Sequence, residues 1–257
     1  MGGRRRVVVV GLGGVTCGGK TTVARRLLAA YPTATLVCAD DYYRPEDWPG
    51  YERLPQFGGF RNYDAANAVD YAALTDAVAA ATGGARRRGE EAERNGDVLL
   101  TSEEKKELDD EKEEGKEQEE GEGEEEEEEK EEGEEQKEEE EKLPPAACLV
   151  VVEGILVFNS EPLNRLFHRR YFFTLPHGEC ARRRGRRRDY DPPCPPGYFD
   201  AVVWPLYVSH QEELVRRGVP LCYVDGRRPT DAIVAEMCGD VDAMMAAPEI
   251  AVKGCRC

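Results

Sequence analysis

Short runs of apolar residues alternate along the chain with longer segments in which apolar positions recur every three or four residues. The short runs are rich in valine and aromatic residues, which is typical of strands buried on both faces. We predict strands over Val7–Val10, Thr33–Ala39, Asp97–Thr101, Cys148–Val152, Tyr171–Pro176 and Val219–Val224. The longer segments predict helices over Lys20–Tyr31, Asp64–Ala81 (stopped by Gly83 and Gly84), Cys180–Arg188, Phe199–Arg217 and Thr230–Met245. This alternation favours an α/β fold built on a parallel sheet.

One segment, Glu103–Lys142, differs in composition from the rest of the chain. It holds 26 of the 52 Asp and Glu and 7 of the 35 Lys and Arg, with almost no apolar residue. The formal net charge of -17 therefore comes from this tract, because the remaining residues carry 26 acidic and 28 basic groups. Such a segment buries too little apolar surface to offset its ordering entropy, so we expect a disordered insertion, 103–142, within one domain over 1–257. It is either a solvated spacer or a weak binding site for basic partners.

The sequence also argues against several classes of protein. No run reaches the roughly 18 apolar residues of a transmembrane helix, and the four valines after Arg6 are too few for a signal-peptide core. The nine cysteines are scattered without a C-x-x-C pair, so neither a zinc site nor a disulfide scaffold is expected. We therefore predict a cytoplasmic protein, with the nucleus as the alternative compartment.

A phosphate-binding loop joins the first predicted strand to the first predicted helix. Residues 14–21, GVTCGGKT, match G-x-x-x-x-G-K-[ST] at every fixed position. In this motif the glycines turn backbone N–H groups toward a polyphosphate, and the helix N-terminus adds the positive end of its dipole. Lys20 is predicted to reach the outer phosphates and Thr21 to coordinate Mg²⁺. The predicted nucleotide contacts are Gly14, Val15, Thr16, Cys17, Gly18, Gly19, Lys20, Thr21 and Thr22. The alternative is a glycine turn without a ligand.

Acidic residues follow two of the predicted strands. Asp40 and Asp41 close the second strand, and Glu153 comes directly after the apolar run Leu149–Val152. Ligands of open α/β sheets bind at the carboxyl edge of the strands, which is where these acids and the phosphate loop meet. A carboxylate there holds Mg²⁺ or accepts the proton of an attacking hydroxyl, so Asp40, Glu153 and Lys20 are candidate catalytic residues. The alternatives are strand-end turns for the aspartates and a capping role for Glu153.

An arginine-rich segment, 182–188, adds a further candidate function. Arginine is suited to grip a transferring phosphoryl group through two parallel N–H donors. A nuclear-localisation signal or a nucleic-acid patch has the same composition, so the segment by itself leaves these readings open. The N-K-x-D motif for guanine is absent, which argues against a GTPase.

Taken together, these segments resemble the nicotinamide riboside kinases of the P-loop nucleoside and nucleotide kinase group. The resemblance lies in GLGGVTCGGKTT (11–22), ADDYYRPED (39–47), NYDAANAVD (62–70), VVEGILVFNSEPL (151–163), RRYFFTLPHGECARRR (169–184), PPGYFDAVVWPLY (195–207) and YVDG (223–226). It implies a five-stranded parallel sheet flanked by helices, with an arginine-rich lid. The implied reaction is ATP-dependent phosphorylation of the 5′-hydroxyl of nicotinamide riboside, and also of nicotinic acid riboside, in NAD biosynthesis.

The resemblance also implies roles for single residues. Asp40 is the expected proton acceptor and is expected to bind Mg²⁺ together with Thr21. Asp64 and Arg184 are expected to recognise the ribosyl hydroxyls, although Asp64 could instead cap its predicted helix. Further expected nucleotide contacts are Arg183, Asp225 and Gly226, and further expected substrate contacts are Asp41, Tyr42, Tyr43, Tyr63 and Tyr190.

Tyr63 and Tyr190 match aromatic residues that surround the pyridine ring of the substrate. A cationic pyridinium ring is well held between the electron-rich faces of tyrosines, and ordinary packing is the alternative. The chain departs from the family at Cys194, where members commonly carry an aspartate. It also has one extra residue between Arg184 and Tyr190.

Two other hypotheses remain open at this stage. A uridine/cytidine-type or pantothenate-type kinase shares the phosphate loop and the strand-end aspartate. A non-catalytic nucleotide-binding protein would use the acidic tract to dock basic partners. The first hypothesis, the riboside kinase, expects a small-molecule substrate as partner, with no nucleic acid and no membrane.

Overall fold

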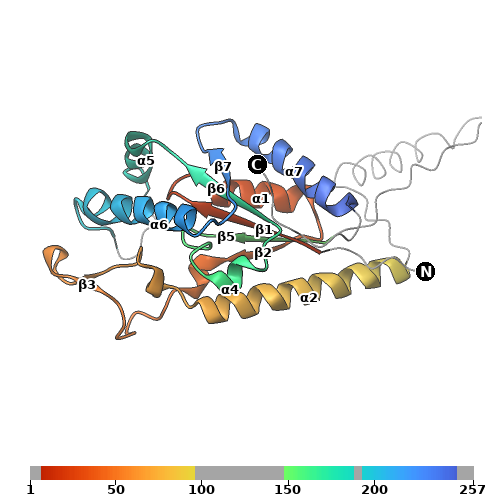
Figure 1. Cartoon of the computed structure of the whole chain (residues 1–257), viewed down its shortest axis with the longest axis horizontal. Helices are drawn as coiled ribbons and strands as arrows, with labels where there is room; N and C mark the ends of the chain where they lie inside the picture. Colours follow the sequence, from red (N-terminus) through yellow and green to blue (C-terminus); the bar gives the residue numbers. More distant parts are fainter. Residues whose placement is uncertain (1–6, 96–147, 188–192, 248–257) are drawn as a thin grey trace, which may run out of the picture.

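A five-stranded sheet lies at the centre of the computed structural model, which describes residues 7–95, 148–187 and 193–247. The strand order is β2-β5-β1-β6-β7, and every neighbouring pair is parallel (Figure 1). The strands are β1 (Val7–Gly14), β2 (Thr35–Cys38), β5 (Cys148–Glu153), β6 (Arg169–Thr174) and β7 (Cys222–Asp225). The predicted α/β fold with five parallel strands is therefore confirmed.

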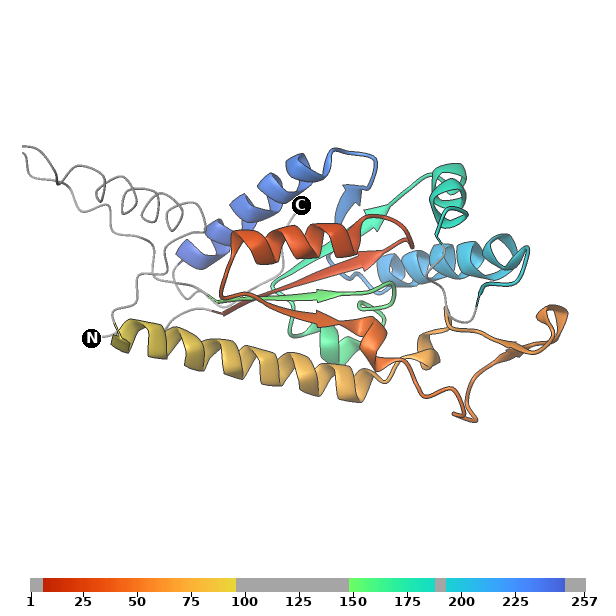
Figure 2. The same ribbon diagram turned by 180° about the vertical axis from the view of Figure 1, so that it is seen from behind.

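Helices cover both faces of this sheet. One layer holds α1 (Lys20–Ala30) and α7 (Thr230–Ala246), and the other holds α2 (Tyr71–Asn95), α4 (Glu161–Asn164) and α6 (Trp204–Arg216) (Figures 1 and 2). Alternate residues of β1 point into the two layers. Val8 and Val10 pack in the same core cluster as Leu27 of α1, whereas Val9 packs with Leu74 of α2. Burial on both faces explains why the sequence of β1 is continuously apolar.

Strand β1 runs four residues beyond its predicted end at Val10. The extension contains glycines because the ring of Phe158 lies against it: a Cβ on Gly11 would come within 2.5 Å of that ring, and one on Gly13 within 2.3 Å. Glycine ordinarily weakens a strand, so the sequence pattern predicted that the strand ends at Val10. The packing of the Phe158 ring instead requires strand residues that have no side chain.

Helix α2 begins and ends later than predicted. Its first turn is capped by Asp70, whose Oδ1 accepts the N–H of Ala73 at 3.1 Å, so the predicted start at Asp64 is wrong. The helix then continues through Gly83 and Gly84 to Asn95. A glycine in a helix interior costs only about 1 kcal/mol relative to alanine, which a helix packed against a sheet tolerates.

The remaining elements lie near the carboxyl edge of the sheet. A short hairpin, β3 (Arg53–Leu54) and β4 (Phe60–Arg61), was not predicted and extends away from the sheet (Figure 1). Helix α5 (His177–Arg184) starts three residues before its predicted position, and a π-helical turn, Phe199–Val203, leads into α6. The predicted strand Asp97–Thr101 and the acidic tract 103–142 lie outside the described residues.

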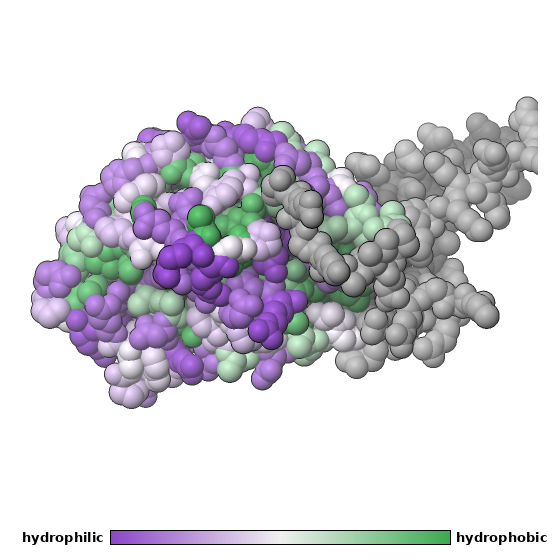
Figure 3. Space-filling model, viewed as in Figure 1, coloured by the Kyte–Doolittle hydropathy of each residue, from purple (hydrophilic) through white to green (hydrophobic). Residues whose placement is uncertain are grey.

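The surface is predominantly polar on the face shown in Figure 3, where apolar residues lie in small groups between hydrophilic ones. Among the described residues, no helix combines the length and the apolar character that crossing a membrane requires.

Candidate active site

The phosphate-binding loop lies between β1 and α1, as the sequence predicts. Gly14 has a φ of 102°, and a Cβ there would lie 2.3 Å from the carbonyl oxygen of Phe173, so only glycine fits. Gly19 has a φ of 98° and directly precedes the first residue of α1. The loop borders a solvent-open cavity of about 380 Å³. Its lining residues are Thr16, Cys17, Gly18, Gly19, Lys20, Thr21, Thr22, Arg25, Asp40, Glu153, Gly154, Ile155, Arg183 and Arg187.

Lys20 is buried beneath this loop. Its Nζ donates to the carbonyl oxygens of Val15 at 2.8 Å and Gly14 at 3.3 Å, so the ammonium is held at the cavity wall. Burial lowers the pKa of Lys20, while the nearby carboxylates of Glu153 and Asp40 act in the opposite direction. Because Lys20 lines the cavity, a polyphosphate bound there would meet its ammonium group at the wall.

The acids after β2 and β5 meet at the same cavity. Thr21 Oγ1 donates to Glu153 Oε1 at 3.0 Å, and Glu153 is only 4% exposed. The Sγ of Cys38 donates to the same carboxylate oxygen at 3.5 Å. Glu153 thus accepts hydrogen bonds within the cavity wall, and the capping role considered for it is not what the structure shows.

Asp40 lies in the 3₁₀ turn Ala39–Tyr42 that follows β2. The carboxylate of Asp40 reaches solvent through the open cavity, but the surrounding protein removes part of its hydration. This desolvation raises the pKa of Asp40, and the negative charge of Glu153 raises it further. Lys20 and Arg187 act against this shift. Two acids that repel each other across a phosphate cavity, beside the hydroxyl of Thr21, offer the oxygen donors that a divalent cation prefers.

These oxygen donors do not form a closed metal cage. Within the described part of the chain, no three or more His, Cys, Asp and Glu side chains are grouped so that they could hold a metal ion by themselves. Mg²⁺ is commonly bound by one or two protein oxygens, with waters and phosphates as the other ligands, so this donor set is compatible with it.

Arg183 links helix α5 to the phosphate loop by hydrogen bonds. Its Nη1 donates to the carbonyl oxygens of Cys17 at 3.3 Å and Gly226 at 3.0 Å. A Cβ on Gly226 would lie 2.5 Å from the carbonyl oxygen of Gly18, so the turn after β7 needs glycine to approach the loop. The carboxylate of Asp225 is paired with Arg227, which lowers its pKa to about 2. Arg183 and Gly226 thus adjoin the phosphate loop, and their predicted contacts with the nucleotide stay predictions.

Asp64 lies on the other side of the loop and is 8% exposed. Its Oδ2 accepts the hydroxyl of Tyr198 at 3.0 Å. Burial raises the pKa of Asp64, and the charge of Arg184 together with the hydrogen bond from Tyr198 works in the opposite direction. Because α2 starts seven residues later, Asp64 is not a helix cap, and that alternative is wrong.

Arg184 hydrogen-bonds the phosphate loop and acts on the Asp64 carboxylate through its charge. Its guanidinium donates to Thr16 Oγ1 at 3.0 Å and to Cys194 Sγ at 3.2 Å. Thr16 borders the phosphate cavity and also the small cavity that contains Asp64. The predicted pair of Asp64 and Arg184 is therefore brought together within reach of the phosphate loop.

Aromatic side chains gather around Tyr63 beside the hairpin. The ring centroid of Tyr63 lies 6.2 Å from that of Tyr43, 5.4 Å from that of Tyr51 and 5.8 Å from that of Phe60, all at steep interplanar angles. Its hydroxyl accepts from Nη1 of Arg61 at 3.2 Å. Tyr43 and Tyr63, both predicted substrate contacts, are therefore neighbours.

Two other predicted substrate contacts are placed elsewhere, and a third is not described. Tyr42 packs against the core on the α2 side of the sheet, and Asp41 is exposed at the edge of the turn. Tyr190 lies outside the described residues.

Two residues of the site, Tyr198 and His210, were not among the predicted site residues, and Arg187 was considered only as part of the arginine-rich segment. Tyr198 hydrogen-bonds Asp64, His210 contacts the Asp64 backbone, and Arg187 lines the phosphate cavity. Tyr198 stands in the PGYFD segment, which was noted only for its resemblance, and Arg187 in the arginine-rich segment. His210 has no motif that marks it.

The sheet order, the phosphate loop and the carboxylates beside it define a P-loop nucleotide-binding fold. No family model matches the chain. Curated relatives match it along most of its length: nicotinamide riboside kinase 1 of Rattus norvegicus is 29% identical over 92% of this chain and 94% of its own. Nicotinamide riboside kinase 2 of Homo sapiens is 29% identical over 91% of this chain and 80% of its own. The protein is thus a nucleotide-binding kinase that resembles the nicotinamide riboside kinases, as the sequence predicted.

Solved structures match the chain only weakly. A sugar kinase from Janibacter sp. is 11% identical with a TM-score of 0.42, over 95% of this chain and 99% of its own. The parallel sheet and the phosphate loop described above define the fold.

Proposed function

We propose that the protein transfers the γ-phosphoryl group of ATP to the 5′-hydroxyl of nicotinamide riboside, forming nicotinamide mononucleotide. Nicotinic acid riboside is the second proposed acceptor, and the step belongs to NAD biosynthesis or salvage in the cytoplasm. The observation that carries this proposal is the meeting of two sites at Thr16, which borders the phosphate cavity on one side and the buried Asp64 on the other. A riboside held at Asp64 therefore lies next to the phosphates.

The phosphate loop and Lys20 would bind the phosphates of ATP. The backbone N–H groups of the loop and the N-terminus of α1 would contact the β- and γ-phosphates. Lys20, already held by the carbonyls of Gly14 and Val15, would stabilise the charge that develops as the bond between the β–γ bridging oxygen and the γ-phosphorus breaks. Arg183 and Arg187 on the α5 side add positive charge to the same cavity.

Mg²⁺ is the proposed cofactor of ATP. Thr21 and Asp40 would supply its protein oxygens, and Glu153, which accepts from Thr21, would orient the hydroxyl. When bound, the ion neutralises charge on the phosphates, which is the contribution expected of it in phosphoryl transfer.

Asp40 is the proposed proton acceptor. As the 5′-oxygen forms its bond to the γ-phosphorus, the hydroxyl proton passes to the Asp40 carboxylate, and ADP leaves with the bridging oxygen. The Asp40 carboxylate borders the open phosphate cavity, which is where an acceptor hydroxyl would have to lie.

The riboside would be recognised through hydrogen bonds to its hydroxyls and contacts of aromatic rings with its base. The Asp64 carboxylate would accept from a ribosyl hydroxyl and the Arg184 guanidinium would donate to one. Tyr63, whose neighbours include Tyr43, would lie against the cationic pyridinium ring. Tyr190 stays a predicted second aromatic wall.

The test is to incubate the purified protein with Mg²⁺-ATP and nicotinamide riboside and to locate the new phosphate by ³¹P and ¹H NMR. The proposal expects a 5′-phosphomonoester, formed with one ADP for each product, and far slower product formation with the Lys20→Ala variant. ATP turnover without a phosphorylated riboside would contradict it.

A further inference from the structure

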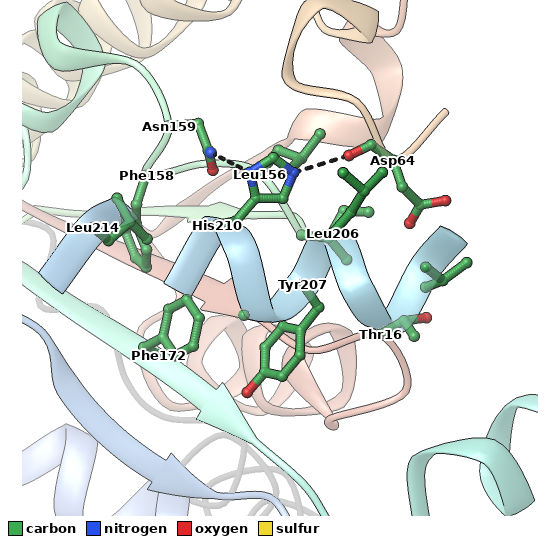
Figure 4. A pocket seen from close by; sticks show the side chains of 13 residues that line it. Thr16, Asp64, Leu156, Phe158, Asn159, Phe172, Leu206, Tyr207, His210 and Leu214 are labelled. Carbon is green, nitrogen blue, oxygen red and sulfur yellow. Dashed lines mark hydrogen bonds between the residues drawn. The ribbon is translucent and has the colours of Figure 1, made fainter. Parts of the chain in front are cut away.

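His210 occupies an otherwise apolar face of α6. Leu206 and Leu214 stand one turn before and one turn after it, and all three line the small internal cavity beside Asp64 (Figure 4). A histidine in such a setting needs hydrogen-bond partners for both ring nitrogens, since an unpaired polar atom there is costly. A leucine would fill the same face without needing hydrogen-bond partners. The partners of His210 therefore indicate what a histidine contributes at this position.

Both ring nitrogens have partners, and they belong to different segments. Nδ1 lies 2.9 Å from Nδ2 of Asn159, in the segment after β5, and Nε2 lies 3.0 Å from the carbonyl oxygen of Asp64 (Figure 4). The carbonyl can only accept, so Nε2 carries the hydrogen and, in the neutral ring, Nδ1 accepts from the Asn159 amide. His210 thus connects the segment after β5 with the backbone of Asp64.

Asp64 is held from three directions. Its N–H donates to Oδ1 of Asn62 at 3.2 Å, its carbonyl accepts from His210, and its Oδ2 accepts from Tyr198. The backbone is therefore fixed on both sides of the Cα atom, and the carboxylate is fixed through one oxygen. None of these three hydrogen bonds uses the second carboxylate oxygen, Oδ1.

We propose that His210 is a positioning residue for ribose recognition, which acts by holding the Asp64 backbone so that the carboxylate meets the ribosyl hydroxyls. This inference rests on the proposed riboside kinase function. It assigns His210 no contact with the substrate and no proton transfer.

The test compares His210→Leu and His210→Gln with the parent protein in steady-state kinetics, with the KM for nicotinamide riboside and for ATP measured separately. His210→Leu removes both hydrogen bonds and should raise the riboside KM roughly tenfold or more, with the ATP KM changed less than about twofold. His210→Gln keeps an N–H donor and should recover most of the loss. In an Asp64→Asn background, His210→Leu should add little further loss, because the carboxylate that it positions is already gone.

A matched control is His168→Leu, since Nδ1 of His168 accepts the N–H of Val9 at 3.0 Å on another part of the sheet. It should lower the melting temperature without a selective change in the riboside KM. Asn159→Ala is an independent test, because it leaves His210 in place but removes the hydrogen bond to its Nδ1. It should shift the riboside KM in the same direction as His210→Leu, and it decides the matter if His210→Leu does not fold.

Three results would overturn the inference. If the parent is active and the variants keep its riboside KM, His210 does not position Asp64. If His210→Leu raises both KM values alike, or if it only lowers the melting temperature as the control does, its role is structural. If the parent forms no phosphorylated riboside, the proposed function fails and takes this inference with it.

Discussion

The hydroxyl of Thr21 donates to the carboxylate of Glu153 at 3.0 Å, although the two residues are 132 positions apart in the chain. This hydrogen bond joins the first turn of α1 to the end of β5. It brings the last residue of the phosphate-loop motif and the acid of a buried strand to one cavity, where Lys20 and Asp40 also lie. The predictions for the catalytic residues follow from this arrangement.

Replacing Lys20 by alanine should lower kcat by roughly 100-fold or more, because the buried ammonium is placed to stabilise charge on the transferring phosphoryl group. The measurement is steady-state turnover of nicotinamide riboside. Arg26→Ala is the control, since Arg26 is an exposed base on the same helix that pairs with Asp231. A Lys20→Ala variant with near-parental kcat would contradict the assignment of the loop.

Replacing Asp40 by asparagine should keep the fold and lower kcat strongly, because the amide neither accepts the hydroxyl proton nor carries a charge toward Mg²⁺. Asp47→Asn, an exposed acid in the following loop, serves as the control and should be close to the parent. Circular dichroism would verify the fold of both variants. If Asp40→Asn turns over like the parent, the proton acceptor is another acid, and Glu153 is the first to test.

Replacing Tyr198 by phenylalanine should raise the riboside KM roughly tenfold and leave the ATP KM unchanged. The variant keeps the buried ring and removes the hydroxyl that donates to Asp64, and a hydrogen bond to a charged group contributes about 1.5–3 kcal/mol. Tyr171→Phe is a matched control, because Tyr171 is also buried and its hydroxyl donates to Asp240 at 2.8 Å, in the α7 layer. Equal effects of the two variants on the riboside KM would count against a specific role for Tyr198.

The riboside KM should also depend on pH through Asp64. Burial raises the pKa of this carboxyl above its ordinary value of 3.8, so the neutral acid persists to higher pH than in an exposed aspartate. Only the ionised form offers both oxygens as acceptors. At saturating ATP, the KM should therefore fall as pH rises through the raised pKa and then level off. The KM of Asp64→Asn should lack this dependence, and a parent KM that is flat between about pH 4 and about pH 8 would contradict the assignment.

The sequence predicts the parts of the fold that local patterns encode. The valine runs of β1 and β5 mark strands buried on both faces, and the glycines around Lys20 mark the phosphate loop. Local patterns fail where a distant residue decides the outcome. Gly11 and Gly13 belong to a strand because the ring of Phe158 needs their space, and Phe158 is far along the chain.

The candidate site divides in the same way. Lys20, Asp40 and Glu153 could be predicted because each follows or ends a buried strand or belongs to a motif. The supports of Asp64 could not, since Tyr198 is 134 positions away and His210 is 146 positions away. Only the packing of α6 and of the π-helical turn before it against the 62–64 segment brings these side chains together.

The central claim is the choice of acceptor, and a one-pot competition tests it most directly. The protein is incubated with limiting Mg²⁺-ATP and equal concentrations of nicotinamide riboside, uridine and cytidine, and the three mononucleotides are quantified by mass spectrometry. The structure and its resemblance predict that nicotinamide mononucleotide is the dominant product. Dominant uridine or cytidine monophosphate would leave the phosphate site intact and contradict the assignment of Tyr63 to the pyridine ring.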